Sequence, residues 1–360
     1  MDIFSLLNSA KEKAASDLHL VAYCPPMLRV NGSLEPIADM PPLTSEDIDQ
    51  AFAQITTPEE REGFARHLEL DFGYTLADNS RVRCNAAKQR GAISLAIRLL
   101  PLKIPTIDEL GLPPVCADLI LRPRGLVVIS GPTGSGKSTT LAAMIQHLNN
   151  NESRHIVTIE DPIEYIHPSL KCAITQRELG EDTTSFAEAL KHVLRQDPDV
   201  ILVGEMRDPE TAAAVLTVAE TGHLVLTTGH APSATQAMER IIDLFPPHER
   251  HLVQGRLASL LIGALCQTLL PKADGSGRVA AVEVMLANSA VRNLIREGKI
   301  YQLPNVIRTH TQEGMALLDQ VLVKLFRQKL ISREHMLAFC NDQGEVQKLV
   351  SGVGLEGNPL

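Results

Sequence analysis

The sequence of 360 residues contains no tryptophan, and only 3% of its residues are aromatic. Proteins that hold single-stranded nucleic acid stack its bases on aromatic rings, so this scarcity argues against such a binding platform. The formal net charge of −9 argues against a broad affinity for nucleic acid or anionic lipid, although it is compatible with a local basic patch. Hydrophobic residues make up 44% of the chain, which is ample for a core filled by leucine, isoleucine, valine and alanine.

The sequence also lacks paired cysteines and long apolar runs. Its six cysteines are scattered singly, which gives little support to a zinc cluster or a disulfide framework. No apolar run approaches the roughly 18 residues of a transmembrane helix. The longest candidate, residues 257–270, is interrupted by Ser259, Gln267 and Thr268 and is interpreted as a core helix. The first residues lack the basic and apolar regions of a signal peptide. We therefore expect a reduced, soluble, cytosolic protein.

Residues 1–100 predict a small α+β domain. Asn31-Gly32 is a strong hairpin signal, and a second hairpin is predicted across residues 77–79. The predicted helices cover residues 3–13, 44–54 and 58–68, and the predicted strands cover residues 18–21, 27–30, 33–37, 70–76, 80–86 and 92–100. A linker is expected at 101–113, where Pro101, Pro105 and Pro113 should restrict the range of orientations.

From residue 114 to residue 360 the pattern becomes an alternation of strands and helices. Continuous apolar strands suit a parallel sheet that is buried on both faces, so we expect an α/β nucleotide-binding core. The predicted strands cover residues 126–130, 155–159, 200–203, 224–227 and 278–286, and helices are predicted at 290–297, 315–328 and 332–339. Residues after Asn341 are dotted with glycine and are expected to be frayed.

The first of these strands leads into a glycine-rich turn and then a helix. The turn fits G-x-x-x-x-G-K-[ST], the phosphate-binding P-loop, in the strand-to-helix context that the motif requires. Glycines let successive backbone N–H groups curl around phosphate oxygens, and the helix N-terminus adds partial positive charge. Lys137 is predicted to reach the β- and γ-phosphates, and the Ser138 hydroxyl to bind Mg²⁺. The predicted nucleotide-binding residues are Gly131, Pro132, Thr133, Gly134, Ser135, Gly136, Lys137, Ser138 and Thr139.

Acidic residues follow two other apolar strands. Residues 197–205 have the form of a Walker B segment, in which Glu205 stands at the strand end, where it could act on Mg²⁺ or on the attacking water. Glu160, Asp161 and Glu164 follow the strand at 155–159, and in a doubly wound sheet that position faces the nucleotide crevice. Clustered carboxylates repel one another unless a cation offsets the charge, and Mg²⁺ with ATP would supply one. An ordinary strand end and a solvated acidic loop are the simpler alternatives.

Histidines and arginines complete the candidate site. His223 and His230 bracket the strand at 224–227, and His230 lies at the same end as Glu205, where it could sense the γ-phosphate or orient water. His223 lies at the other end, where a structural role is as plausible as a chemical one. Arg81 and Arg83 lie two residues apart, hence on one face of a strand, and Arg98 lies on the next. On this pattern alone, exposed strand arginines are the favoured interpretation over a charge-neutralising arginine finger.

Taken together, these segments resemble the secretion-type AAA-like ATPases that power type IV pili and type II secretion. Within that family the sequence is most similar to the pilus-retraction (twitching-motility, PilT-type) motors. The resemblance extends over about residues 5–340. The matching segments are residues 16–32, 131–144, 158–167, 176–212, 220–234, 243–250 and 290–299.

This resemblance implies a PAS-like N-terminal domain, a RecA-like ATPase core and a helical C-terminal region. The family's Walker A, Asp box, Walker B and His box then correspond to Gly131–Thr139, Glu160–Glu164, Gly204-Glu205, and His223 with His230. The implied cofactors are ATP and Mg²⁺, and the implied assembly is a homohexameric ring. The implied partner is an inner-membrane pilus platform protein, which would hold the ring at the inner face of the cell membrane.

The same resemblance gives roles to individual residues. It implies that Glu205 is the general base or positions water, with Glu160, Glu164 and His230 beside it. Arg81, Arg83 and Arg98 would act from a neighbouring subunit. Residues 228–231 read Thr-Gly-His-Ala, whereas the family usually has Thr-Leu-His-Thr, and residues 84–97 also depart from its usual pattern.

Several alternatives stay open on the sequence. Extension or secretion ATPases of the same superfamily usually carry an additional N-terminal domain and a tetracysteine metal site, neither of which is seen in this sequence. An accessory retraction paralogue fits the same segments. A weakly hydrolysing regulatory module is disfavoured by Glu205 and the Asp box. A nucleic-acid translocase is disfavoured by the negative charge and the few aromatic residues.

Overall fold

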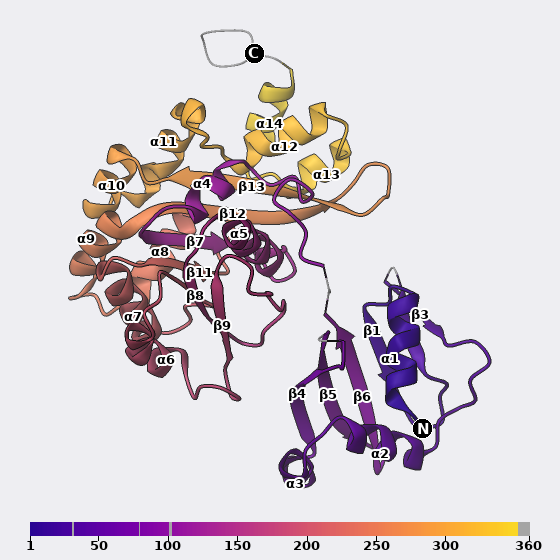
Figure 1. Ribbon diagram of the computed structural model, residues 1–360. Helices are drawn as coiled ribbons and strands as arrows, with labels where there is room; N and C mark the ends of the chain where they lie inside the picture. The colour runs from indigo at the N-terminus through magenta and orange to yellow at the C-terminus, as the bar shows by residue number, and fades with distance from the viewer. Residues whose placement is uncertain (31, 79, 101–102, 352–360) are drawn as a thin grey trace. The chain divides into compact units, whose positions relative to one another are not determined.

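The structure, a computed structural model, describes residues 1–30, 32–78, 80–100 and 103–351. The chain forms two compact units (Figure 1). Within the described residues, the first unit comprises Met1–Lys103 with Glu164–Ile166, and the second comprises Ile104–Ile163 with His167–Leu360. Among these residues, no helix has both the length and the apolar character to span a bilayer.

The first unit is an antiparallel sheet covered by helices. Its described strands follow the order β3-β2-β1-β6-β5-β4, and each neighbouring pair is antiparallel. The elements are α1 (Ile3–Glu12), β1 (Asp17–Leu20), β2 (Met27–Val30), β3 (Ser33–Pro36), α2 (Ser45–Gln54), α3 (Pro58–His67), β4 (Glu69–Thr75), β5 (Arg81–Gln89) and β6 (Ala92–Leu99). The apolar sides of the three helices share one core with alternate residues of the strands. The predicted α+β architecture is confirmed.

Local sequence signals explain the helix starts and turns in this unit. Thr44 and Thr57 each form a capping box with an acidic residue three positions later, which satisfies N–H groups of the first helical turn. The predicted hairpin partners pair as Val30 with Ser33 and Thr75 with Arg81. The turn residues Asn31 and Asn79, and Pro101 of the predicted linker, lie outside the described residues.

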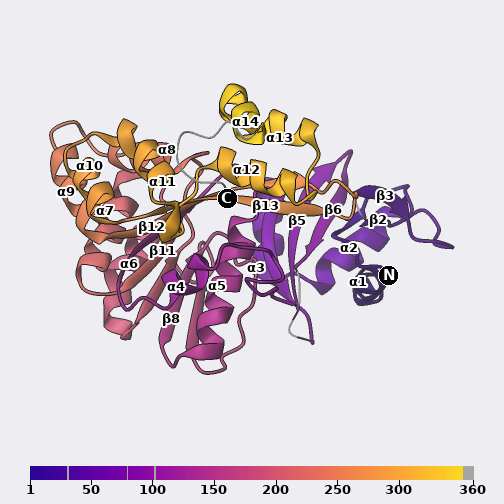
Figure 2. The ribbon, with the colours of Figure 1, turned by 90° about the horizontal axis from the view of Figure 1, so that it is seen from above.

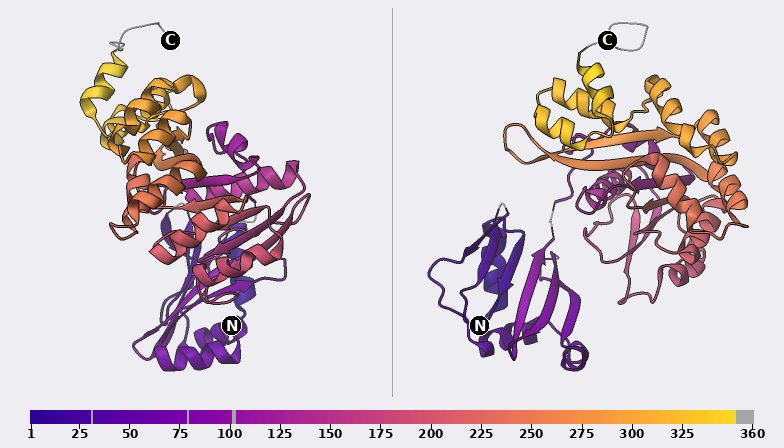
Figure 3. Two further views of the ribbon diagram at one scale, coloured as in Figure 1. Left: turned by 90° about the vertical axis from the view of Figure 1, so that its left-hand side faces the viewer. Right: turned by 180° about the vertical axis from the view of Figure 1, so that it is seen from behind.

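In the described part of the second unit, a seven-stranded sheet has the order β13-β12-β7-β11-β10-β8-β9. All neighbouring pairs are parallel except β12 with β13. The strands are β7 (Gly125–Ser130), β8 (His155–Glu160), β9 (Ala173–Glu178), β10 (Val200–Val203), β11 (Leu224–Thr228), β12 (Leu261–Pro271) and β13 (Arg278–Leu286). The antiparallel β12–β13 hairpin is the long orange element of Figure 3.

Helices cover both faces of this sheet. The helices are α4 (Val115–Ile120), α5 (Lys137–Asn151), α6 (Phe186–Val193), α7 (Pro209–Glu220), α8 (Ala234–Asp243), α9 (Arg250–Leu260), α10 (Ser289–Arg296), α11 (Leu303–Thr309), α12 (Leu318–Arg327), α13 (Arg333–Phe339) and α14 (Gln343–Val350). Helices α4 and α5 share a core with one set of alternate strand residues, and α6 to α11 share a core with the other. Figure 2 shows α12, α13 and α14 gathered together, and they form a further small core with residues of β12 and β13.

The predicted core helix at 257–270 is wrong beyond Leu260. Helix α9 ends there, and Leu261 takes an extended conformation (φ −59°, ψ 131°) that begins β12. The run is apolar on both faces because β12 lies inside the sheet, between β7 and β13. An apolar run of this kind does not distinguish a buried strand from a buried helix by periodicity. The pairing that decides the matter includes hydrogen bonds with β7, which is distant in the sequence.

Two shorter segments also differ from expectation. The residues after Asn341 include the helix α14, which begins at an Asp342 cap and buries Val346. Both carboxylate oxygens of Asp319 accept hydrogen bonds from the N–H groups of Asn341 and Asp342, which fixes the chain just before α14. Strand β9 was not predicted because it is an edge strand with a largely polar sequence.

Candidate functional site

Four neighbouring strands of the second unit end together at one edge of the sheet. Residue pairs near their carboxyl ends align, with Thr228 opposite Ile129, Thr227 opposite Val203, and Val203 opposite Ile159. The segments that leave this edge are therefore the P-loop after β7, the His230 segment after β11, Glu205 after β10 and Glu160 after β8. In open α/β sheets this edge is where ligands bind.

The P-loop is shaped by close approach to strand β12. Gly131 has φ +145°, and a Cβ there would lie only 2.2 Å from the backbone oxygen of Gln267. Gly136 has φ +89°, and a Cβ there would lie 2.9 Å from the Gln267 side-chain nitrogen. These two positions require glycine both for their backbone angles and for space. Pro132, Thr133 and Gly134 are exposed, so the crest of the loop is open to a ligand.

Lys137 lies within the curl of the loop. Its Nζ donates hydrogen bonds to the backbone oxygens of Gly131 at 2.8 Å and Pro132 at 3.0 Å. Gly136, at the N-cap of α5, provides no side chain to cap this 15-residue helix. Ser138 and Thr139 are half-buried in the first turn. A cation and a helix N-terminus thus face the same place, which is the arrangement that binds phosphate.

Glu205 is a buried carboxylate at this edge. Its side chain is 10% exposed and has one partner at each oxygen. The His230 Nε2 lies 3.1 Å from Oε2, and the Arg207 guanidinium lies 2.5 Å from Oε1. The two partners are much more exposed, at 43% for His230 and 68% for Arg207. The structure therefore brings Glu205 and His230 together, and it adds Arg207, which the sequence interpretation missed despite its place two residues after Glu205.

His223 lies at the opposite end of β11. Its Nδ1 is 2.8 Å from the Thr221 hydroxyl, and its backbone oxygen accepts a hydrogen bond from Gly125 N–H at the start of β7. These contacts tie His223 to Thr221 and to the start of β7.

The acidic residues at and after the end of β8 fall in two different compact units. Glu160 is half-buried, and its Oε1 accepts hydrogen bonds from the Thr158 hydroxyl at 2.6 Å and the Gln176 amide at 3.2 Å. It stands beside the β10 end, because Gly204 N–H donates to the Ile159 oxygen. Glu164 is exposed and belongs to the first compact unit, whereas Glu160 belongs to the second.

Where this sequence departs from the His-box pattern, the substituted residues pack against β7. Gly229 N–H donates to the Ile129 oxygen at 2.9 Å, and a Cβ on Gly229 would lie 3.3 Å from the Ser130 hydroxyl. Ala231 is buried, and its backbone oxygen accepts the Ser130 hydroxyl at 2.7 Å. The small residues let the His230 segment lie tightly against the start of the P-loop.

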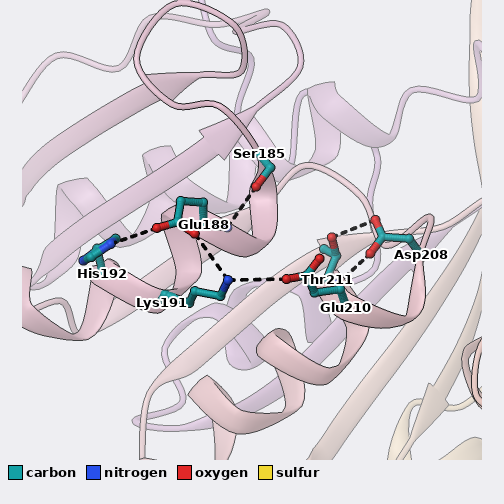
Figure 4. A network of polar contacts seen from close by, with 7 residues as sticks. All are labelled: Ser185, Glu188, Lys191, His192, Asp208, Glu210 and Thr211. Carbon is teal, nitrogen blue, oxygen red and sulfur yellow. Dashed lines mark hydrogen bonds and ion pairs between the residues drawn. The ribbon is translucent and has the colours of Figure 1, made fainter.

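The segment after Glu205 is fixed where α7 begins. Figure 4 shows the Asp208 carboxylate accepting hydrogen bonds from the backbone N–H and the hydroxyl of Thr211, at 2.7 and 2.8 Å. The same view shows Lys191 of α6 between Glu188 and Glu210, which links α6 to α7. A side-chain N-cap and this bridge hold the helix that starts four residues after Glu205.

The three candidate arginines lie together on the first unit. Arg81 and Arg83 alternate with the buried Val82 and Cys84, so they point away from the helix-covered core. Arg83 lies directly opposite Arg98 on β6. The sheet thus carries a basic strip on its open face.

One acidic residue balances part of this strip. Asp17 of β1 lies opposite Arg98, whose Nε is 3.0 Å from Oδ1. Burial raises the pKa of Asp17, but hydrogen bonds from Ser16 and Arg98 outweigh this and leave the pKa below its usual value. Asp17 and Arg98 are therefore a charged pair in the folded unit.

The residues of this edge can be compared with what Mg²⁺ would require. Among the described residues, no group of three or more histidine, cysteine, aspartate or glutamate side chains could hold a metal ion alone. Magnesium commonly keeps several waters and takes one or two protein ligands plus substrate phosphates. Ser138 at the head of α5 suits that role.

Comparisons with known proteins agree with this geometry. The family described as type II/IV secretion system protein matches residues 3–337. The type IV pilus retractation ATPase PilT of Pseudomonas aeruginosa is 47% identical over 335 residues, which cover 93% of this chain and 97% of that protein. A twitching motility protein of Neisseria gonorrhoeae is 44% identical over 332 residues, with 92% and 88% covered. A crystal structure of the pilus retraction motor PilT with bound ADP superposes with a TM-score of 0.91 at 42% identity, and it covers 97% of this chain and 99% of that one.

The fold class predicted from the sequence is thus confirmed, since the described elements match an N-terminal domain followed by a secretion-ATPase core. The chain belongs to the type II/IV secretion system protein family, and within it the chain is a homologue of the type IV pilus retraction ATPases.

Proposed function

We propose that this chain is an ATP-hydrolysing motor that drives type IV pilus retraction. The observation that carries the proposal is the buried Glu205 carboxylate, held by His230 and Arg207 at the same sheet edge as the P-loop. A phosphate-binding loop alone supports only nucleotide binding. A carboxylate held beside it gives hydrolysis a residue that can orient or deprotonate water.

The residues divide the work as follows. Lys137 exchanges its contacts with Gly131 and Pro132 for contacts with the phosphates, and the N–H groups of the loop surround the same oxygens. Ser138 supplies a hydroxyl to Mg²⁺, which offsets phosphate charge when it is bound. Glu205 fits the task of positioning water better than that of a metal ligand, because both of its oxygens already have cationic or histidine partners. His230 orients Glu205 and stands where it can respond to the γ-phosphate.

Hydrolysis assays test this proposal. We expect wild-type protein to hydrolyse ATP and Glu205→Gln to lose about 10²–10⁴-fold in kcat, the range for loss of a general base. Glu239→Gln removes an exposed carboxylate of α8 and should remain close to wild type. Equal, near-zero rates in wild type and Glu205→Gln would instead favour a regulatory nucleotide-binding module.

We propose further that the chain works as a homohexamer in which Arg81, Arg83 and Arg98 act on the nucleotide of a neighbouring subunit. The open basic face of the first unit supports this role, because transition-state charge on a phosphoryl group is commonly met by an arginine delivered from another chain. Mixing inactive Glu205→Gln subunits with inactive Arg83→Ala subunits tests it. Some mixed interfaces would combine an intact Glu205 with an intact Arg83, so activity should return. If mixing restores nothing, the arginine acts within its own subunit or not at all.

The proposed partner is the inner-membrane platform protein of the pilus, which places the ring at the inner face of the membrane through that partner only. Loss of the gene should give hyperpiliated cells that do not twitch. Bald cells would favour an extension ATPase, and wild-type piliation with weakened retraction would favour an accessory paralogue. DNA and RNA should leave the ATPase rate unchanged.

A further inference from the structure

Strand β12 carries a buried glutamine at the level of the P-loop. Within the sheet, Leu265 lies opposite Ile129 and Cys266 opposite Ser130, so Gln267 follows directly beside the point where β7 turns into the loop. Gln267 is only 4% exposed. An amide at such a place needs partners for both its oxygen and its nitrogen.

Both ends of this amide bind the nucleotide loop. Gln267 Nε2 donates to the backbone oxygen of Ser135 at 2.7 Å, and Oε1 accepts the Thr140 hydroxyl at 2.7 Å. Ser135 lies in the loop and Thr140 lies in the first turns of α5, and both are buried. One side chain therefore ties the loop to the helix that follows it.

The backbone oxygen and the side chain of Gln267 also limit the space available to the loop. The Gln267 oxygen occupies the space that a Cβ on Gly131 would need, and its side-chain nitrogen lies close to Gly136. Gly131, Gly136 and the Ser135 carbonyl between them thus all lie against Gln267 of strand β12.

These contacts differ in kind from those of Lys137. The lysine binds the oxygens of Gly131 and Pro132 on the side where phosphate would enter, so a ligand can replace them. Gln267 binds the Ser135 oxygen from the buried side, where no ligand competes. With that carbonyl held inward, the neighbouring N–H groups can point toward the phosphates. The amide of Gln267 provides both the donor for Ser135 and the acceptor for Thr140, whereas an ionised carboxylate has no donor and a thioether has neither a donor nor a strong acceptor.

We propose that Gln267 is a positioning residue of the nucleotide site, which keeps the P-loop in its phosphate-binding conformation before the nucleotide arrives. The inference rests on the nucleotide site of the proposed function, but it concerns a residue outside every motif from which that function was argued. The free energy of nucleotide binding is then not reduced by the cost of ordering the loop.

The test uses the full-length chain and two readouts. Gln267→Met keeps the length of the side chain and removes both hydrogen bonds, whereas Thr140→Val removes one of them with little change in volume and Thr140→Ser keeps it. The control is Asn149→Leu, which breaks an equally buried amide at the far end of α5, where Asn149 binds Pro168, Leu170 and Cys172. The first readout is amide hydrogen exchange of residues 131–136 without nucleotide, and the second is the Kd for ADP together with the melting temperature.

We expect Gln267→Met to speed exchange in the loop and to raise the ADP Kd by about tenfold or more, as the loss of one to two hydrogen bonds implies. Thr140→Val should change both readouts in the same direction but less, Thr140→Ser should resemble wild type, and the double variant should not exceed Gln267→Met. Asn149→Leu should lower the melting temperature and leave loop exchange and Kd unchanged.

Unchanged loop exchange and Kd in Gln267→Met, or equal changes in Asn149→Leu, would overturn the inference. If Gln267→Met does not fold, Thr140→Val against Thr140→Ser decides the question by the same readouts. If wild-type protein fails to bind ADP or ATP, the proposed function fails, while loop exchange still decides the role of Gln267.

Discussion

The sharpest test of how the P-loop is built compares two alanine substitutions within it. At Gly131 an added Cβ would lie 2.2 Å from the backbone oxygen of Gln267, and the backbone has φ +145°. At Gly134 the backbone also has a positive φ of +77°, but an added Cβ would meet nothing within 4 Å. Both substitutions strain the backbone, and only the first also collides with a neighbouring strand.

The magnitudes follow from these two contributions. A residue with a side chain at Gly134 should cost about 1–2 kcal/mol for the left-handed backbone. At Gly131 the strain is about 1–3 kcal/mol, and forcing β7 and β12 apart adds about 1–3 kcal/mol as overpacking does elsewhere. Because 1 kcal/mol shifts the melting temperature of a unit this large by about 2–4 °C, we expect a fall of roughly 5–20 °C for Gly131→Ala and under about 8 °C for Gly134→Ala.

Differential scanning calorimetry with and without ADP measures both effects. Gly131→Ala should lose stability without nucleotide and should also lose most of the stabilisation by ADP, since the shifted loop no longer presents its N–H groups. Gly134→Ala should keep its fold, with only the small fall in melting temperature given above, and should lose nucleotide affinity. If the two variants melt at the same temperature in the absence of nucleotide, the close contact between the loop and β12 does not exist and the reasoning fails.

Three further outcomes are expected. Arg207→Ala should lower kcat for ATP hydrolysis by about tenfold with little change in KM, because it frees one oxygen of Glu205 from its charged hydrogen bond, and an unchanged kcat would remove Arg207 from the site. Asp17→Asn should cost the first unit about 1 kcal/mol at pH 7, since an exposed partner limits the pair. Because the pKa of Asp17 is lowered in the folded unit, this stability is present above the ordinary pKa of 3.8 and is lost as the pH falls through the folded value. In urea unfolding at a series of pH values, the free energy of unfolding of Asp17→Asn should therefore fall less on acidification than that of wild type. Maleimide labelling of native protein followed by mass spectrometry should modify the exposed Cys24 first and leave Cys84 unmodified, because burial raises the pKa of the Cys84 thiol to about 12.

Most of the second unit could be predicted because its signals are local. The strand, the glycine turn and the helix of the P-loop are consecutive in the sequence, and the apolar strands ending at Glu160, Glu205 and His230 are each continuous. Parallel pairing then brings their carboxyl ends to one edge without further information. The helices α2 and α3 of the first unit are also set by local sequence, since each is capped by a threonine and an acidic residue three positions apart.

The failures share a different cause. Strand β12 was interpreted as a helix because its apolar run has no decisive period and because one of its two neighbours, β7, comes from a distant part of the chain. That error also hid Gln267, which looked like a polar interruption of a helix rather than a partner of Ser135 and Thr140. Arg207 was within a recognised segment, but nothing in its spacing indicated that it would bind Glu205.

The charges of the second unit are consistent with the proposal that a cation from a neighbouring subunit completes the site. At the sheet edge, the Glu205 carboxylate already engages Arg207 and His230, and Lys137 lies within the curl of the P-loop. When phosphate binds, Lys137 can turn to it, but Arg207 is the partner of a carboxylate that must keep its position. The basic strip of Arg81, Arg83 and Arg98 lies on a separate unit and faces away from that unit's own core. We propose that the arrival of such a cation at the nucleotide accompanies a movement of the unit that carries it, which would couple hydrolysis to displacement, as a motor requires.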